Sequence, residues 1–100
     1  MSFSYTLHPE ADKEYAGAYA WYEDQSQGLG EKFIDAVKQK LAAIAAKPEL
    51  FGSKSKGFRE TIVSRAFPYS IVYKIAIEQK AIYIVSIYHS KRNPKKKYRK

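Results

Sequence analysis

Apolar and polar side chains alternate over residues 3–7, which predicts a short strand with one buried face. After Pro9, apolar positions recur every three or four residues until about Asp24, which predicts a helix. A second apolar stripe with the same spacing predicts a second helix, which Pro48 ends. This stripe consists of Phe33, Ile34, Val37, Leu41, Ile44 and Ala45. The glycine-bearing link at residues 25–30 predicts that the two helices pack antiparallel as a hairpin.

The hydrophobic period changes to two residues after Pro48. Residues 51–57 are expected to form a loop, and three strands are predicted over residues 58–65, 69–78 and 81–88. The connections between these strands are short, so neighbouring strands should be antiparallel.

The last two predicted strands differ in how many of their faces are apolar. Odd-numbered residues from Tyr69 to Ile77 form one apolar face, which we expect to pack against the helical hairpin. The final strand is apolar on both faces and is expected to be central. Its two faces are Ala81, Tyr83, Val85 and Ile87, and Ile82, Ile84, Ser86 and Tyr88. The predicted fold class is α+β in the order β-α-α-β-β-β, a single domain with the hairpin on one face of a small, twisted, mainly antiparallel sheet.

Charge is distributed unevenly between the two halves of the chain. Residues 1–50 hold five Lys and eight Asp or Glu, a net charge of −3, whereas residues 51–100 hold thirteen Lys or Arg and two Glu, a net charge of +11. Seven basic side chains and no acid lie in the tail at residues 89–100. They are Lys91, Arg92, Lys95, Lys96, Lys97, Arg99 and Lys100. Such a field attracts phosphate-rich or acidic partners, so the tail is predicted to bind a polyanion, the alternative being a solvated tail.

Several classes of site are excluded by the residue types that the chain lacks. It has no Cys, which removes disulfides, thiolate zinc sites and cysteine nucleophiles. Its two His residues are far apart and give no metal-ligand pattern, so neither a metal nor another cofactor is expected. The longest apolar runs fall well short of the ~20 residues that span a bilayer, and the N-terminus does not resemble a signal peptide. No membrane contact and a cytoplasmic location are therefore expected.

Five short segments occur in a fixed order along nearly the whole chain. They are His8-Pro9-Glu10-Ala11, Trp21-Tyr22-Glu23 before Gly28-Leu29-Gly30, Pro48-Glu49-Leu50-Phe51, Phe67-Pro68-Tyr69-Ser70-Ile71-Val72-Tyr73 and His89-Ser90-Lys91-Arg92-Asn93-Pro94. Together with the length and the basic C-terminus, they resemble the RelE/ParE superfamily of toxins from bacterial type II toxin-antitoxin, or plasmid stabilisation, systems. The resemblance implies the fold predicted above and a cognate antitoxin as a partner. Such an antitoxin is expected to be acidic and to order as it wraps the toxin.

Two different activities are implied by the resemblance. RelE-like members cut mRNA on the ribosome without a metal, which requires an acid, a base and cations around one phosphate. ParE-like members bind and poison DNA gyrase and have no catalytic set. The Phe67-Pro68-Tyr69 segment and the Arg92-Asn93-Pro94 segment followed by Tyr98 look more similar to the ParE-like branch. A gyrase inhibitor is the leading hypothesis, and the alternatives are a ribosome-dependent endoribonuclease and a non-toxic basic binding module of the same fold.

His89 and Arg59 are the candidate catalytic residues if the protein is an endoribonuclease. His89 ends the last predicted strand, where some RelE-like nucleases similarly place a histidine, but Ser90 stands here in place of their aromatic residue. Arg59 and Arg65 are expected to share a strand face about 20 Å apart, so at most one of them can bind the scissile phosphate. The segment Tyr69–Tyr73 lacks the arginine that nuclease relatives tend to carry, which counts against RNA cleavage.

Contacts with the target or another polyanion are expected from basic and aromatic residues outside the core. They are Arg65, Lys91, Arg92, Lys95, Lys96, Lys97, Tyr98 and Arg99. On the ParE-like interpretation, the tail and the exposed side of the first helix would contact gyrase or its DNA. Trp21 is expected to close the hairpin onto the sheet, with a recognition surface as the alternative. For Tyr88, packing is a simpler interpretation than base stacking, because the chain contains nine Tyr.

Overall fold

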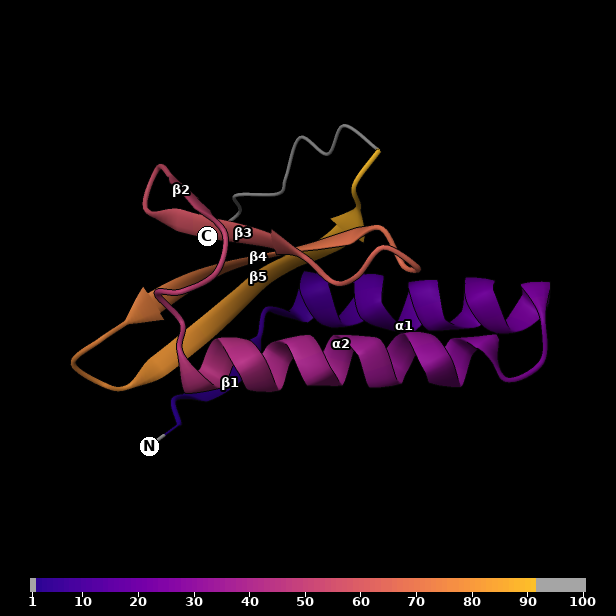
Figure 1. The fold of residues 1–100 in the computed structure, drawn as a ribbon, viewed down its shortest axis with the longest axis horizontal. Coiled ribbons are helices and arrows are strands. Elements are labelled where there is room, and N and C mark those ends of the chain that lie inside the picture. The colour runs from indigo at the N-terminus through magenta and orange to yellow at the C-terminus, as the bar shows by residue number, and fades with distance from the viewer. Residues whose placement is uncertain (1, 92–100) are drawn as a thin grey trace.

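The computed structural model describes residues 2–91 of the chain, in which a helical hairpin lies along one face of a sheet (Figure 1). The elements are β1 (Ser4–Leu7), α1 (Pro9–Gln25), α2 (Leu29–Ala46), β2 (Ser53–Ser55), β3 (Phe58–Ile62), β4 (Tyr69–Ala76) and β5 (Ala81–His89). The strand order is β1-β5-β4-β3-β2, with β1 parallel to β5 and the other pairs antiparallel. The predicted α+β fold class and the interior position of the last strand are confirmed. No helix in the described part of the chain is both long and apolar enough to cross a membrane.

Strand β2 lies within the segment that we expected to be a loop. It pairs with the first half of β3 through a two-residue turn at Lys56 and Gly57, whose φ angles of 54° and 82° suit a hairpin turn. Hydrophobic periodicity could not predict β2, because the stretch between Phe51 and Phe58 contains no apolar side chain. Strand β3 is also shorter than predicted and ends at Ile62.

The two helices are fixed at their ends by side chains that bind backbone N–H groups. His8 Nδ1 accepts the N–H of Glu10 at 3.0 Å at the start of α1. Glu23, near the end of α1, accepts the N–H groups of Gly28 and Gly30, both at 2.9 Å. Gly28 has a φ of 87°, and Gly30 lies against α1. The prediction that a glycine-bearing link joins the two helices of the hairpin is therefore confirmed.

The core lies between the hairpin and the sheet. Its fully buried large side chains include Phe33, Val37 and Ile44 of α2 and Ile71, Tyr73, Ile82, Ile84 and Ile87 of the sheet. The opposite face carries a second, smaller apolar cluster of Phe58, Val72, Val85 and Tyr88. Two expectations about buried faces are wrong at the strand ends: Tyr5 of β1 is 42% exposed and Ile77, just beyond β4, is 59% exposed.

A bulge in β5 overturns the prediction of strict alternation along that strand. Val72 of β4 lies opposite Ser86, whereas the next residue, Tyr73, lies opposite Ile84, so Val85 is an extra residue. An extra residue shifts every later side chain to the other face. Ile87 therefore joins Ile84 in the hairpin-covered core instead of sharing a face with Val85.

Candidate functional site

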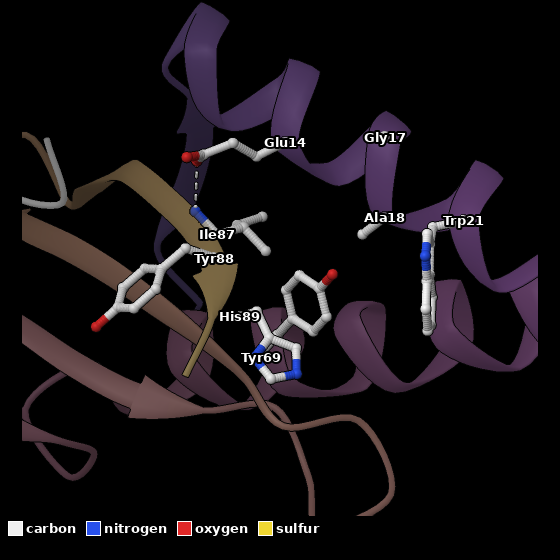
Figure 2. Close-up of a pocket in the computed structure, with 8 residues that line it drawn as sticks. All are labelled: Glu14, Gly17, Ala18, Trp21, Tyr69, Ile87, Tyr88 and His89. Carbon is white, nitrogen blue, oxygen red and sulfur yellow. Dashed lines mark hydrogen bonds between the residues drawn. The ribbon is translucent and has the colours of Figure 1, made fainter. Parts of the chain in front are cut away.

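A hollow of about 310 Å³ lies between α1 and the C-terminal end of β5 (Figure 2). Its lining residues are Glu14, Gly17, Ala18 and Trp21 of α1 and Tyr69, Ile87, Tyr88 and His89 of the sheet. A second hollow of about 290 Å³ shares Trp21, Tyr69 and His89 with it and adds Lys91. Because they share these three residues, we treat the two hollows as one feature, the α1–β5 groove.

The groove exists because β1 is shorter than β5. Strand β1 ends at Leu7, opposite Ile84, so the rest of β5 has α1 rather than a strand beside it on that side. Glu14 Oε1 occupies this position and accepts the N–H of Ile87 at 2.9 Å and the hydroxyl of Ser86 at 3.3 Å. The carboxylate thus satisfies a strand edge that would otherwise be left unpaired.

Glu14 was not recognised from the sequence, although a signal for it was present. It is three residues after Ala11 and four before Ala18, both of which are buried, so it lies on the sheet-facing side of α1. A carboxylate on a buried helix face needs a hydrogen-bond donor, and here the bulged region of β5 supplies that donor.

His89 is half-buried at the end of β5, on the same face as Ile87. Its ring meets the ring of Tyr69 edge to face, with centroids 5.3 Å apart. Its Nδ1 accepts the N–H of Lys91 at 3.2 Å. The imidazole therefore stabilises the turn after β5 and forms part of the groove wall, packed against Tyr69.

Arg59 is engaged in a structural contact at the other end of the sheet. Its Nη1 donates to the carbonyl oxygen of Phe51 at 3.2 Å. The hydroxyl of Tyr73, which lies opposite Arg59, donates to the carbonyl oxygens of Pro48 at 2.7 Å and Phe51 at 3.1 Å. Burial raises the pKa of Tyr73, and the nearby Arg59 opposes that rise. Arg59 and Tyr73 together hold the turn that follows α2.

The two candidate catalytic residues are not brought together. Arg59 pairs with Tyr73 of β4, and His89 pairs with Tyr69 of the same strand. Four residues along a strand correspond to about 13 Å, and β3 and β5 lie two strand spacings apart, a further ~10 Å. The two side chains are thus too far apart to act on one phosphate group.

The structure describes two of the residues that were predicted to contact the target, Arg65 and Lys91. Arg65 is exposed in the connection after β3, so the expectation that it shares a strand face with Arg59 is wrong, because the strand has already ended at Ile62. Lys91 is exposed and lines the groove. The others lie outside the described residues: Arg92, Lys95, Lys96, Lys97, Tyr98 and Arg99.

Trp21 does not close the hairpin onto the sheet, and this expectation is wrong. Its side chain is 54% exposed, at the edge of the groove, and it meets Tyr22 edge to face with ring centroids 5.1 Å apart. Tyr22, one residue later, takes the core position and contacts Phe33, Phe67 and Tyr69. The helix thus buries the neighbouring tyrosine and leaves Trp21 on the surface, which was the alternative interpretation.

The sheet face opposite the hairpin carries packing residues. Tyr88 is buried there and its hydroxyl donates to the carboxylate of Glu60, so packing is the role of this tyrosine. The ammonium group of Lys74 lies 4.9 Å from the ring centroid of Phe58. Among residues 2–91, no cluster of three or more His, Asp or Glu side chains is arranged to hold a metal ion.

Residues 5–94 match the family model described as "ParE toxin of type II toxin-antitoxin system, parDE". No curated protein matches the chain significantly. The match covers every helix and nearly all of every strand, together with the groove described above.

Solved structures of bacterial toxins have the same fold. The isolated RelE toxin of E. coli is 18% identical with a TM-score of 0.66, and the alignment covers 92% of this chain and 88% of that one. The chromosomal ParDE system of P. aeruginosa is 19% identical with a TM-score of 0.67, and the alignment covers 88% of this chain and 96% of that one. The toxin in the intact RelBE toxin-antitoxin complex of E. coli is 18% identical with a TM-score of 0.67, and the alignment covers 91% of this chain and 100% of that one. At these identities the likeness concerns the fold alone.

Proposed function

Since the chain belongs to the ParE toxin family of type II toxin-antitoxin systems, we propose that it is a toxin that inhibits DNA gyrase and that a cognate antitoxin neutralises it. Solved structures with this fold include a RelE toxin bound to an antitoxin peptide and the intact RelBE complex, which supports an antitoxin partner. The proposal includes the bacterial cytoplasm as the compartment, because gyrase acts there. It also includes a role in plasmid stabilisation, which the resemblance to type II toxin-antitoxin systems implies.

The separation of Arg59 and His89 is the observation that favours gyrase over mRNA as the target. RNA cleavage in which the ribose 2′-hydroxyl attacks the neighbouring phosphate needs an acid, a base and a cation around that phosphate. Arg59 and His89 lie at opposite ends of the hairpin-covered face, and each is engaged by a backbone group. A protein that acts by binding gyrase needs no such convergence, and the basic sequence after β5 suits contact with gyrase-bound DNA.

The experiment that tests the proposal is pulse labelling after induction of the protein in bacteria without its antitoxin. We expect incorporation of labelled thymidine to fall within minutes while incorporation of labelled methionine continues. An early fall in methionine incorporation alone would instead support the ribosome-dependent endoribonuclease. If neither changes, the chain is a binding module with the toxin fold.

The same proposal can be tested in vitro with the purified protein and purified gyrase. We expect the protein to inhibit supercoiling of relaxed plasmid by gyrase. The variants His89→Ala and Arg59→Lys should keep that inhibition, in proportion to the fraction of folded protein, because neither side chain is proposed to do chemistry. The proposal would be contradicted by a variant that circular dichroism shows to be folded but that is no longer toxic because it has lost mRNA cleavage.

A further inference from the structure

A hollow of about 350 Å³ lies along the seam between α1 and α2. Its lining residues are Asp12, Tyr15, Ala16 and Tyr19 of α1 and Glu31 and Ile34 of α2. Spacings of three and four residues place each set on one face of its helix. We call this aromatic and acidic strip the hairpin seam. It shares no lining residue with the α1–β5 groove and is therefore a separate feature.

Carboxylates give the hairpin seam a negative potential. Asp35 follows Glu31 by about one helical turn, so both lie on the same side of α2. Glu31 is the main cause of the raised pKa of Tyr19. Burial raises the pKa of Tyr15, and Tyr5 and Asp35 raise it further. A carboxylate beside a phenol disfavours ionisation of the phenol, so these shifts show that the acids act on the tyrosines of the seam.

The lysines of the hairpin do not neutralise these acids. Lys13, the residue after Asp12, pairs instead with Glu10 at 3.2 Å. Asp12 and Asp35 make no ion pair within the described part of the chain. The buried hydroxyl of Tyr15 likewise has no hydrogen-bond partner among residues 2–91, which is rare for a buried polar atom. The seam thus keeps both negative charge and hydrogen-bonding capacity unused.

This combination of rings and carboxylates suits the side chain of a lysine or an arginine. The face of a phenol ring attracts a cation, and a carboxylate pairs with it directly. An acidic segment, such as the expected antitoxin, would instead meet like charge at the seam. The partner that fits the hairpin seam is therefore a basic one.

The chain itself contains a segment with the required charge. Residues 92–100 include six Lys or Arg and no acid. Nine residues span up to roughly 30 Å when extended, which is enough to reach a neighbouring molecule. The opposite net charges of the two halves of the chain, −3 and +11, also favour contact between the first half of one copy and the second half of another.

We propose that the hairpin seam binds the basic C-terminal segment, residues 92–100, of a second copy of this chain, with a lysine or arginine side chain placed among the tyrosines and carboxylates of the seam. The seam and the segment are different surfaces, so two copies either exchange segments reciprocally or continue head to tail. This inference does not rest on the proposed function, because it concerns contacts between copies of one chain.

Two double variants with the same change in charge test the seam. The first, Asp12→Asn with Asp35→Asn, removes two of its carboxylates. The matched control, Glu49→Gln with Glu78→Gln, removes two exposed carboxylates outside the hairpin and raises the net charge by the same two units. Sedimentation equilibrium of each full-length protein measures self-association. Fluorescence anisotropy of a labelled peptide with the sequence of residues 92–100 measures binding of the segment.

We expect the unaltered chain to self-associate at about 50 mM salt and to be largely monomeric at about 500 mM, because salt screens contacts between surface charges. The seam variant should weaken self-association and peptide binding about tenfold, and the control should stay within about threefold of the unaltered chain. A third variant, Lys95→Gln with Lys96→Gln and Lys97→Gln, should weaken self-association to a similar extent. This third variant leaves the helices unaltered, so it tests the contact even if the seam variant does not fold.

Three results would overturn the inference. One is an unaltered chain that remains monomeric at about 50 mM salt up to a concentration of about 1 mM. Another is self-association or peptide binding that the seam variant, shown to be folded by circular dichroism, reduces no more than the control does. The third is a monomeric chain that binds the peptide through the seam, which would assign the seam to a basic partner other than a second copy.

Discussion

The two ends of the hairpin-covered sheet face are built from similar residues but differ in how completely they are filled. At one end, Tyr73 and Arg59 direct their polar groups onto the carbonyl oxygens of the turn after α2. At the other end, the rings of Tyr69 and His89 meet edge to face beside a hollow that α1 leaves open. A tyrosine and a basic or titratable residue lie at both ends, so residue type alone does not distinguish a structural cluster from a binding site.

The difference comes from the segment of chain that covers each end. At the closed end, the chain after α2 runs directly over Tyr73, and its backbone carbonyl groups accept the available donors. At the open end, α1 contributes Gly17, which has no side chain, and Ala18, whose side chain is a single methyl group, to the lining of the hollow. The open end therefore keeps a hollow at the surface, and the closed end is where substitutions should reduce stability.

The largest effect is expected at the closed end, from Tyr73→Phe. Removal of the hydroxyl leaves the buried carbonyl of Pro48 without its 2.7 Å partner, which should lower the free energy of unfolding by about 1–3 kcal/mol. Urea denaturation measures the loss. The control is Tyr83→Phe, a partly exposed tyrosine of β5, which should change stability by less than about 0.5 kcal/mol. Equal losses in both variants would mean that the closed end is not held by this hydroxyl.

Glu14 tests whether the open end has a structural element of its own. Glu14→Ala leaves the N–H of Ile87 without an acceptor and should cost about 1–2 kcal/mol of unfolding free energy by the same measurement. Glu14→Gln retains a carbonyl acceptor at the same length and should lose less than half as much. If Gln is as damaging as Ala, the negative charge matters more than the hydrogen bond.

Two glycines should respond in opposite directions to the same change. Gly17→Ala should raise the unfolding free energy by roughly 0.5–1 kcal/mol, because the helix gains propensity and the added Cβ meets nothing within 4 Å. Gly30→Ala should lower it, because the new Cβ would crowd Tyr19 and Glu23. Thermal denaturation of the pair checks the result, and stabilisation by both substitutions would remove the argument that only Gly30 is required by packing.

The smallest effect is a pH dependence at the alkaline end. Burial raises the pKa of Tyr73 above its ordinary value of 10.0, so this phenol ionises more readily in the unfolded chain. Its contribution to stability is then complete below about pH 10 and declines as the pH rises through the folded-state pKa. Melting temperatures at about pH 8 and about pH 10.5 should show a decline that is smaller in Tyr73→Phe. An identical decline in that variant would assign the effect to other tyrosines, such as Tyr15 and Tyr22, whose pKa values burial also raises.

The sequence predicted the elements more successfully than it predicted the site. The stripe from Phe33 to Ala45 and the apolar faces of the last two strands identified both the hairpin core and the interior strand, because hydrophobic periodicity is a local property. Arg59 and His89 were candidate catalytic residues only for an endoribonuclease, on the basis of residue type and of the resemblance, and the structure places them far apart. Trp21 was assigned to the core, although the neighbouring Tyr22 fills that position.

What the sequence by itself determined is the order and type of most elements, the hairpin link at the glycines and the concentration of positive charge after β5. Only the tertiary structure decided which face each residue of β5 occupies beyond Val85, because the bulge is a property of the pairing between two strands and not of either strand alone. The bulge places Ile87 and His89 toward the hairpin, and the short β1 leaves them beside α1. The groove thus depends on register and on strand length relative to a partner strand, neither of which local periodicity encodes.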